Sequence, residues 1–190
     1  MINKSLPSFD QLPISESDKE RLKNQVTTQI FEKNSTVIHQ GEVCKKVFFI
    51  RKGLVKLSYI TREGKEFIKS FIQEGEMLGS LYSQLRGGGS TFNAIAIEEL
   101  EVDSLDYNIF QQLIQENPTL QRFALVFFQQ LALKKEIREY EFLCLSAQQR
   151  YEKFCEQQPD LIQRIRQADM ALYLGITPIA LSRMKNRATK

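Results

Sequence analysis

The last quarter of the chain carries side chains whose charge could bind a polyanion. Four of the last eight residues are basic: Arg183, Lys185, Arg187 and Lys190. From Arg150 onward there are eight Lys/Arg and four Asp/Glu, a net charge of +4, whereas the remaining 149 residues hold 18 basic and 19 acidic groups, a net charge of −1. A basic end on a nearly neutral body is compatible with a polyanionic partner, but charge alone favours a simpler interpretation. That interpretation is a solvated helix end, where cations complement the helix dipole.

The stretch ADMALYLGITPIALSRM, residues 168–184, has two short apolar-periodic runs on either side of one glycine. A helix-turn-helix needs a small residue where the helices cross and a turn residue with positive φ four positions later, and Ala171 and Gly175 satisfy both needs. Thr177 can cap the second helix and Pro178 can begin it. The pattern predicts a helix-turn-helix, with a ligand-free helical hairpin as the alternative. The predicted apolar contacts between the two helices are Met170, Leu174, Ile176, Leu181 and Met184.

Side chains beyond the first turn of the second helix would meet DNA if that helix entered the major groove. The polar ones could reach bases or phosphates, and the basic ones would mainly neutralise phosphates. The first turn, from Pro178 to Ala180, offers no side-chain hydrogen bonds, so sequence specificity is expected to be modest or carried elsewhere. The candidate DNA-binding residues are Thr177, Pro178, Ser182, Arg183, Lys185, Asn186 and Arg187.

Short β-branched and aromatic runs fill the segment from Gln29 to Asp106. The sequence TREGKE predicts a hairpin turn between two of them. Strands at regular spacing with glycine turns indicate an antiparallel β-roll or barrel. The glycines that mark this spacing, at intervals of 12, 11 and 11 residues, are Gly41, Gly53, Gly64 and Gly75.

Helical patterns flank this segment. Ser17–Glu20 has the pattern of a capping box, which predicts a short helix from about Ser17 to Thr27. Helical spacing returns near Tyr107, and Asn117-Pro118 then resembles an N-cap followed by proline at the first helical position. From there a helix can run over residues 118–146 without an internal Gly or Pro. A further helix is expected around residues 148–156, with QQPD as a break before the terminal hairpin.

The long helix has two apolar faces and would span roughly 43 Å, which is too long to lie wholly against one small β domain. Two apolar faces require two partners, so we expect one face to pack on the roll and the other on a second copy of the helix. A homodimer through residues 118–146 follows, although a single-copy helical bundle would also bury both faces. One stripe holds Phe123, Val126, Leu133, Ile137, Tyr140 and Cys144, and the other Leu120, Phe127, Phe128 and Leu131.

Composition excludes several classes of protein. The chain is 42 % hydrophobic and 26 % charged, with no apolar run of membrane-spanning length and no hydrophobic signal region in MINKSLPSFDQLP. Cys44, Cys144 and Cys155 are scattered, which argues against a disulfide framework or a zinc site and for a reducing cytoplasm. One histidine is too few for a typical metal-dependent enzyme, and no nucleophile elbow or P-loop occurs. We therefore expect no enzymatic activity, no metal and no membrane partner.

The stretches VIHQGEVCKKVFFIRKGLVKLSYITREGKEFIKSFIQEGEMLGS and YLGITPIALSRM resemble the Crp/Fnr family of bacterial transcription regulators. The resemblance implies an α+β protein: an antiparallel β-roll of the jelly-roll type that senses cyclic nucleotides, a long dimerisation helix and a small helix-turn-helix domain that binds DNA. On this chain those parts would be residues 1–117, 118–146 and 147–190.

The resemblance also indicates an effector pocket in EGEMLGSLYSQLRGGGSTF, where the family's phosphate-binding cassette lies. Family members that bind cyclic nucleotides carry Glu where this chain has Ser80, and Arg where it has Ser90. Both charged anchors are missing, and Arg86 could substitute only if the three-glycine loop folded back. We expect a pocket that is degenerate for cyclic AMP and holds another small anion or nothing. Lys134 could face this pocket, but a solvated helical lysine is the favoured interpretation. The candidate effector-binding residues are Gly79, Ser80, Leu81, Arg86, Ser90, Thr91 and Lys134.

Two functions follow from these observations. The first is a DNA-binding transcription regulator of the Crp/Fnr type with a degenerate cyclic-nucleotide pocket. Its partners would be duplex DNA, a second copy of the chain and, at most, a small-molecule effector. The second is a dimeric sensor or interaction module with the same roll but without functional DNA binding.

Overall fold

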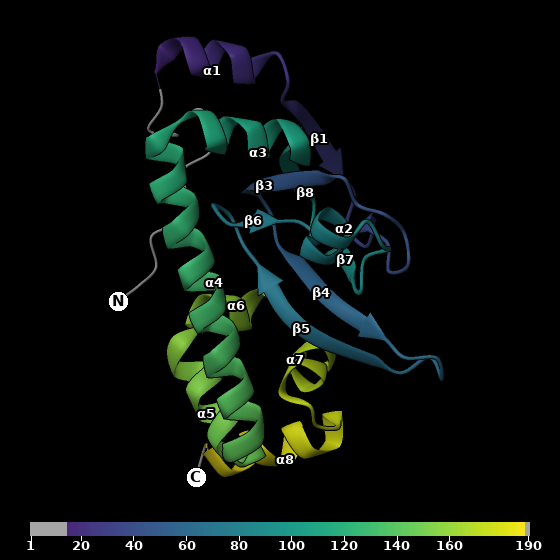
Figure 1. Ribbon diagram of the computed structural model, residues 1–190. Helices are drawn as coiled ribbons and strands as arrows, with labels where there is room; N and C mark the ends of the chain where they lie inside the picture. Colours follow the sequence, from purple (N-terminus) through teal and green to yellow (C-terminus); the bar gives the residue numbers. More distant parts are fainter. Residues whose placement is uncertain (1–14, 189–190) are drawn as a thin grey trace. The chain divides into compact units, whose positions relative to one another are not determined.

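The computed structural model describes residues 15–188, which form two compact units (Figure 1). The roll unit comprises residues up to Lys65 together with Lys69–Val126. The helical unit comprises the residues from Phe127 onward together with Glu66–Ile68. Helix α4 (Pro118–Cys144) contributes to both units.

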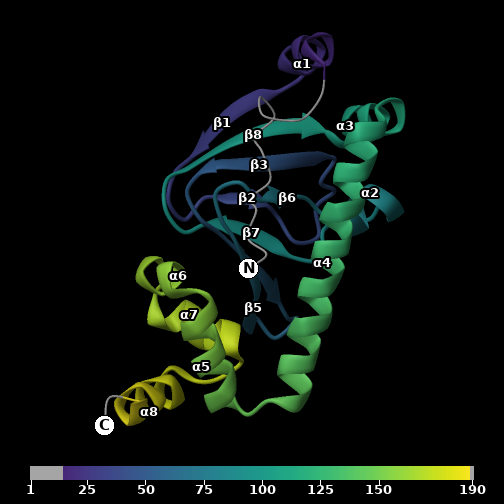
Figure 2. The same ribbon diagram turned by 90° about the vertical axis from the view of Figure 1, so that its left-hand side faces the viewer.

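The strands form two antiparallel four-stranded sheets, one ordered β1-β8-β3-β6 and the other β2-β7-β4-β5 (Figure 2). With the helices, this arrangement confirms the predicted α+β class and the antiparallel roll. The β4–β5 hairpin turns at TREGKE as predicted, with the Gly64 N–H donating to the Thr61 carbonyl at 3.0 Å. The strands are β1 (Thr27–Phe31), β2 (Thr36–Ile38), β3 (Lys46–Lys52), β4 (Val55–Ile60), β5 (Glu66–Ile72), β6 (Met77–Leu78), β7 (Asn93–Ala96) and β8 (Leu100–Asp106).

The main core consists of apolar side chains contributed by both sheets. Successive strand residues point to opposite faces, so alternate positions of β4, such as Val55 and Leu57, enter this core. Leu100 and Val102 of β8 enter it from the other sheet. This alternation is the reason that the short apolar runs of the sequence form a roll.

A second core covers one face of the sheet that contains β3 and β8. Three helices contribute to it: α1 (Glu16–Lys23), α3 (Tyr107–Glu116) and the start of α4. The rings of Phe49 and Phe110 meet edge to face, with their centroids 6.2 Å apart. The fully or nearly buried members are Leu22, Val47, Phe49, Leu105, Phe110, Leu113 and Leu120.

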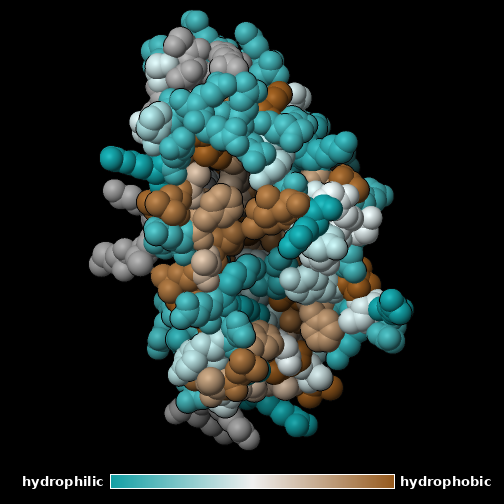
Figure 3. Space-filling model, viewed as in Figure 1, coloured by the Kyte–Doolittle hydropathy of each residue, from teal (hydrophilic) through white to brown (hydrophobic). Residues whose placement is uncertain are grey.

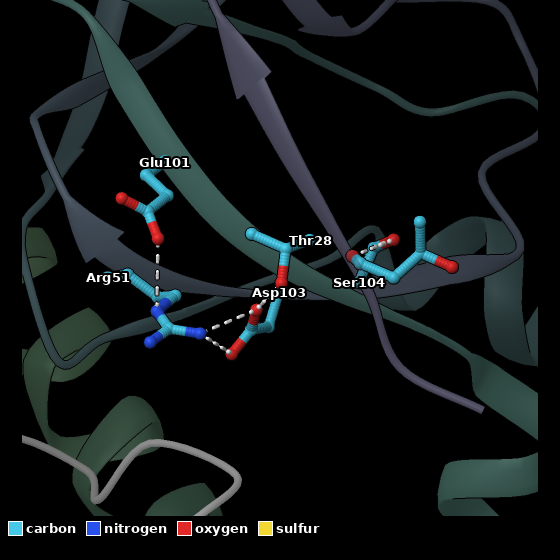
Figure 4. Close-up of polar contacts among 6 residues, drawn as sticks. Thr28, Arg51, Glu101, Asp103 and Ser104 are labelled. Atoms are coloured by element: carbon cyan, nitrogen blue, oxygen red, sulfur yellow. Dashed lines mark hydrogen bonds and ion pairs between the residues drawn. The ribbon is translucent and has the colours of Figure 1, made fainter. Parts of the chain in front are cut away.

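Strands β1, β3 and β8 of the same sheet also carry a network of polar side chains (Figure 4). The carboxylate of Asp103 is almost completely buried, and it accepts hydrogen bonds from Thr28 Oγ1 at 2.7 Å and from Arg51 Nη1 at 3.3 Å. Arg51 Nε also lies 3.2 Å from a carboxylate oxygen of Glu101. Because a buried charge is costly unless paired and hydrogen-bonded, this network explains how Asp103 is accommodated.

The N-terminal helix differs from its prediction at both ends. It begins at Glu16, so Ser17 lies inside the first turn rather than at the N-cap, and it ends at Lys23 rather than near Thr27. Thr27 is instead the first residue of β1 and pairs with Ser104 of β8. The β-branched residues after Val26 favour a strand, and pairing with β8 outweighs the helical pattern.

The predicted long helix is present as α4. Its first turn is capped by Asn117, whose side-chain oxygen accepts from the N–H groups of Thr119 and Leu120. Leu120 is buried in the second core, and Phe123 packs there beside it rather than with the other members of its predicted stripe. No helix within residues 15–188 has both the length and the apolar character needed to cross a bilayer.

The helical unit contains α5 (Ala147–Gln157), α6 (Pro159–Arg164), α7 (Gln167–Leu174) and α8 (Pro178–Ala188), besides the end of α4. Helix α5 begins with a capping box between Ser146 and Gln149. The interpretation of QQPD as a simple break was incomplete, because Pro159 begins α6 there. Proline at the first helical position costs no hydrogen bond, so it can start a helix as well as end one.

Candidate functional site

The terminal hairpin has the helix-turn-helix form that the sequence predicted. Met170, Ala171 and Leu174 of α7 and Leu181 of α8 are buried, and Ile176 and Met184 are half-buried. Gly175 has φ +69° and its N–H donates to the Ala171 carbonyl, so the turn requires the left-handed conformation that glycine adopts most readily.

Helix α8 presents its polar side chains to solvent. Thr177 Oγ1 accepts from the Ala180 N–H at 3.2 Å, which is the predicted N-cap. Ser182, Arg183 and Asn186 are exposed and lie within about 100° of arc on the helix, away from the buried Leu181. Within the described residues, Arg183 takes part in no ion pair.

The other candidate DNA-binding residues have different surroundings. Pro178 is exposed at the start of α8, and Lys185 is half-buried. Arg187 lies in α8, but its side chain and the whole of Lys190 fall outside the described residues. Ile179 is 67 % exposed on the same side of the helix as Ser182 and Arg183, so the first turn presents an apolar side chain to solvent.

Sequence reasoning missed one ion pair with a buried carboxylate at the other end of the hairpin. Asp169, in the first turn of α7, is almost completely buried, and its two oxygens lie 2.7 and 3.1 Å from the guanidinium of Arg166. Hydrogen bonding to Asp169 raises the pKa of Arg166. An acidic residue in the first turn of a predicted helix was the available signal.

Two arginines that bind the hairpin were also missed, namely Arg138 of α4 and Arg150 of α5. Both donate to carbonyl groups at the end of α7. No local pattern could have identified them, because their partners lie 35 and 24 positions away in the sequence.

In the roll unit, the predicted cassette surrounds α2 (Leu81–Arg86). Ser80 is fully buried and caps this helix, accepting from the Ser83 N–H at 3.4 Å. The N–H of Gly87, which has φ +72°, donates to the Ser83 carbonyl and ends the helix. The Ser80 hydroxyl is therefore used to begin α2.

Ser90 also bonds within its own segment. Its hydroxyl donates to the Phe92 carbonyl at 2.8 Å, and its backbone N–H and carbonyl bond Glu42 and Gly41 at 2.7 Å. The backbone at Gly89 lies so close to Gly41 that a Cβ there would overlap the Gly41 carbonyl. The glycine loop is thereby held against residues 41–42.

The remaining effector candidates do not supply a buried anchor. Leu81, Arg86 and Thr91 are exposed, with Arg86 in the last turn of α2. Gly79 lies before the helix, and a Cβ there would be 2.9 Å from the Gln84 amide nitrogen. A cavity of about 240 Å³ opens beside α2, but its lining includes none of the candidate residues.

Lys134 lies in the helical unit and is exposed. Burial raises the pKa of Tyr173, and the charges of Arg138 and Lys134 act in the opposite direction. The Lys134 ammonium is therefore close enough to α7 to act on the Tyr173 phenol.

Helix α4 exposes most of one predicted stripe. Val126, Leu133, Ile137 and Tyr140 are between 40 and 55 % exposed in the single chain, and Cys144 is exposed as well. These residues follow a heptad spacing, and apolar side chains are visible along α4 (Figure 3).

Comparison with known proteins agrees with this architecture. Residues 28–117 match the family of the cyclic nucleotide-binding domain. The cAMP-activated global transcriptional regulator CRP of Salmonella typhimurium is 36 % identical over 90 residues, and the global nitrogen regulator of a Nostoc species is 33 % identical over 94 residues. These alignments cover 47 and 48 % of this chain, and 43 and 42 % of the two relatives, so the chain matches less than half of their length.

Solved structures extend the likeness of fold beyond the roll. A CooA variant from Carboxydothermus hydrogenoformans superposes with a TM-score of 0.78 at 17 % identity, covering 98 % of this chain and 84 % of that one. FixK2 from Bradyrhizobium japonicum superposes with a TM-score of 0.76 at 16 % identity, covering 85 and 83 %. The sequence matches lie within the roll, and the two superposed structures, at 17 and 16 % identity, show a likeness of fold.

Proposed function

We propose that this chain is a DNA-binding transcription regulator of the Crp/Fnr type, in which α8 enters the major groove of duplex DNA. The observation that supports this most strongly is the exposed face of α8. Ser182, Arg183 and Asn186 are available to a ligand, whereas Leu181 on the opposite side anchors the helix in the hairpin. Similarity to named transcription regulators supports the same function over an ordinary enzyme.

The proposed regulator is a homodimer that pairs through residues 118–146. The exposed apolar residues of α4 follow the heptad spacing of a coiled-coil seam, and a second copy of the helix would cover them. A two-fold dimer would present its two recognition helices about 34 Å apart, to successive major grooves on one side of the duplex. It would act in the cytoplasm, where its three free cysteines would stay reduced.

We further propose that the roll is degenerate as a cyclic-nucleotide pocket. The Ser80 and Ser90 hydroxyls bond groups of their own segment, and neither could replace the charge of the missing Glu or Arg. Arg86, the nearest cation in the cassette, is exposed at the far end of α2. An effector of this roll would need a different set of contacts, such as those of another small anion.

The salt dependence of DNA binding tests the proposed regulator. Fluorescence anisotropy of a labelled 30-base-pair duplex of mixed sequence would be measured from about 50 to 200 mM KCl, a range over which phosphate contacts lose most of their affinity. We expect binding at low salt that weakens steeply. Arg183→Gln should reduce the slope of log K against log salt by about 1.8 in a dimer, because each phosphate contact contributes about 0.9.

Arg62→Gln is the matched control, because Arg62 is an exposed arginine in the β4–β5 turn of the roll unit. It removes the same charge from the chain and should leave the slope unchanged. Absence of binding at the lowest salt would contradict the proposal.

One observation favours the second function, an interaction module without DNA binding. Ile179 exposes a large apolar side chain at the start of α8. A groove-binding helix normally carries polar side chains there, which hydrogen-bond the base edges. Such a side chain could contact a thymine methyl group or a protein surface. Retained dimerisation without affinity for duplex DNA would support the interaction module.

A further inference from the structure

The turn of the hairpin is bonded by two arginines that lie outside the hairpin. Arg150 of α5 donates from Nε and Nη2 to the Leu174 carbonyl at 3.2 and 3.1 Å, and from Nη1 to the Leu145 carbonyl at 2.6 Å. Arg138 of α4 donates from Nη2 to the Tyr173 carbonyl. The last carbonyls of a helix have no partner within it, so these guanidinium groups satisfy the C-terminal end of α7.

Aromatic rings surround the same two arginines. The guanidinium carbon of Arg138 lies 3.7 Å from the ring centroid of Tyr173 and 4.2 Å from that of Phe142. The guanidinium carbon of Arg150 lies 4.9 Å from the Phe142 centroid. Burial lowers the pKa of Arg138 and raises that of Tyr173, and both side chains are half-buried, so this cluster is partly shielded from water. Such desolvation strengthens a cation–π contact.

The turn glycine is part of the same contact. A Cβ on Gly175 would lie 2.9 Å from the ring of Phe142, so the turn of the hairpin packs directly on α4. Phe154 of α5 adds a second ring contact, with its centroid 5.1 Å from that of Tyr173. The C-terminal part of α4, the start of α5 and the end of α7 therefore meet around these arginines.

We propose that Arg138 and Arg150 are positioning residues for DNA recognition: they hold the hairpin turn on the C-terminal part of α4 and so set the direction of α8 relative to α4. This inference rests on the proposed DNA-binding function. In a dimer paired through α4, the direction of α8 determines whether both recognition helices reach successive grooves. Neither arginine needs to touch DNA to have this effect.

Arg138→Met tests the proposal in the full-length protein. We expect the affinity for the mixed-sequence duplex to fall about tenfold, as for the loss of one partly buried charge-assisted contact, while the salt slope stays that of the wild type. Arg138→Lys, which keeps the charge but loses the planar fork, should recover only part of the affinity. Arg62→Met is the control for removal of an exposed arginine and should have no effect.

Hydrogen exchange gives a readout that does not depend on DNA. The Gly175 and Ile176 N–H groups donate to the Ala171 carbonyl, so a peptide over residues 171–181 reports on the turn. Arg138→Met should increase exchange in that peptide about fivefold or more, and leave a peptide over β7 and β8 unchanged.

The outcomes separate the two proposals. Unchanged exchange in Arg138→Met, or faster exchange with wild-type affinity, would overturn the positioning role. A reduced salt slope would show that Arg138 contacts phosphate itself, which would also overturn it. If the wild type binds no DNA, the proposed function fails by itself. Exchange in Arg138→Met and Arg138→Lys then still decides whether the arginine holds the turn.

Discussion

The predicted sites in the two units differ in what their polar side chains bond to. In the roll unit, the hydroxyls of Ser80 and Ser90 stand where charged anchors would be, and both bond groups of their own segment. In the helical unit, Ser182, Arg183 and Asn186 remain exposed. The comparison teaches that a residue type suited to binding is not enough. The side chain must also be exposed and not already bonded within the protein. By that measure the proposed function assigns a ligand to the hairpin and a degenerate pocket to the cassette.

Glycines show a second difference between the units. Gly87 of the cassette and Gly175 of the hairpin both have positive φ, +72° and +69°. Nothing lies within 4 Å of a Cβ placed on Gly87, whereas one on Gly175 would strike Phe142. The first glycine serves only the backbone conformation of its turn, and the second also allows close packing.

The largest expected effect comes from removing a buried leucine from the core of either unit. Leu181 of α8 and Leu54 of the roll are both completely buried. Either Leu→Ala change should lower the free energy of unfolding by about 2–5 kcal/mol, which urea denaturation followed by circular dichroism would measure. Only Leu181→Ala should also abolish DNA binding at a temperature where both variants are folded. Equal loss of affinity in Leu54→Ala would break the distinction between the units.

The next effect compares the two glycines. Gly87→Ala should cost about 1 kcal/mol, because a side chain at positive φ is strained, and Gly175→Ala should cost about 1 kcal/mol more because the Phe142 ring must move. Urea midpoints of both variants give the difference. Adding Phe142→Ala to Gly175→Ala removes the obstruction, so the two changes should cost less than their sum. Strict additivity would contradict the packing explanation.

A smaller effect depends on pH and concerns two tyrosines whose pKa is raised. Burial, together with a hydrogen bond to Cys155, raises the pKa of Tyr151 in the helical unit from 10.0 to about 12. The folded state holds this proton more tightly than the unfolded state. Its contribution is therefore complete below pH 10 and is lost as the pH rises toward 12.

The measurement compares urea midpoints at pH 9 and near pH 11.5. Tyr151→Phe should remove about 1–2 kcal/mol of the alkaline loss of stability. Burial raises the pKa of Tyr59 in the roll unit as well, but that side chain is 39 % exposed, so Tyr59→Phe should change the alkaline loss less. A larger effect of Tyr59→Phe than of Tyr151→Phe would contradict the stronger pKa shift assigned to Tyr151.

The smallest expected effect is that of cyclic AMP on the roll. A ligand that binds only the folded state raises the melting temperature, so millimolar cyclic AMP should shift it by less than about 1 °C if the pocket is degenerate. Differential scanning fluorimetry measures this shift. Ser80→Glu combined with Ser90→Arg restores the family's charged anchors, and this variant should show a shift that the wild type lacks. A clear shift in the wild type would contradict the degenerate pocket.

Most elements of the fold could be predicted because their signals are local. The period-2 runs with glycine turns predicted the roll, and Asn117-Pro118 predicted the start of α4 at the correct residue. The errors lie where a local pattern was compatible with two structures and tertiary contacts selected the other one. Helix α1 ended early because residues from Thr27 pair with β8, and Phe123 left its predicted stripe because the second core lies beside it.

The sequence by itself determined that residues 168–184 form a helix-turn-helix, because the steric needs at Ala171 and Gly175 act over a few neighbouring positions. It also determined which residue types could occupy the exposed face of the second helix. Only the tertiary structure decided that the cassette hydroxyls bond inside their own segment, and that Arg138 and Arg150 bind the end of α7. Hydrogen bonds between residues 24 and 35 positions apart form only after the helices have packed. No local pattern encodes which distant carbonyl a long arginine side chain will reach.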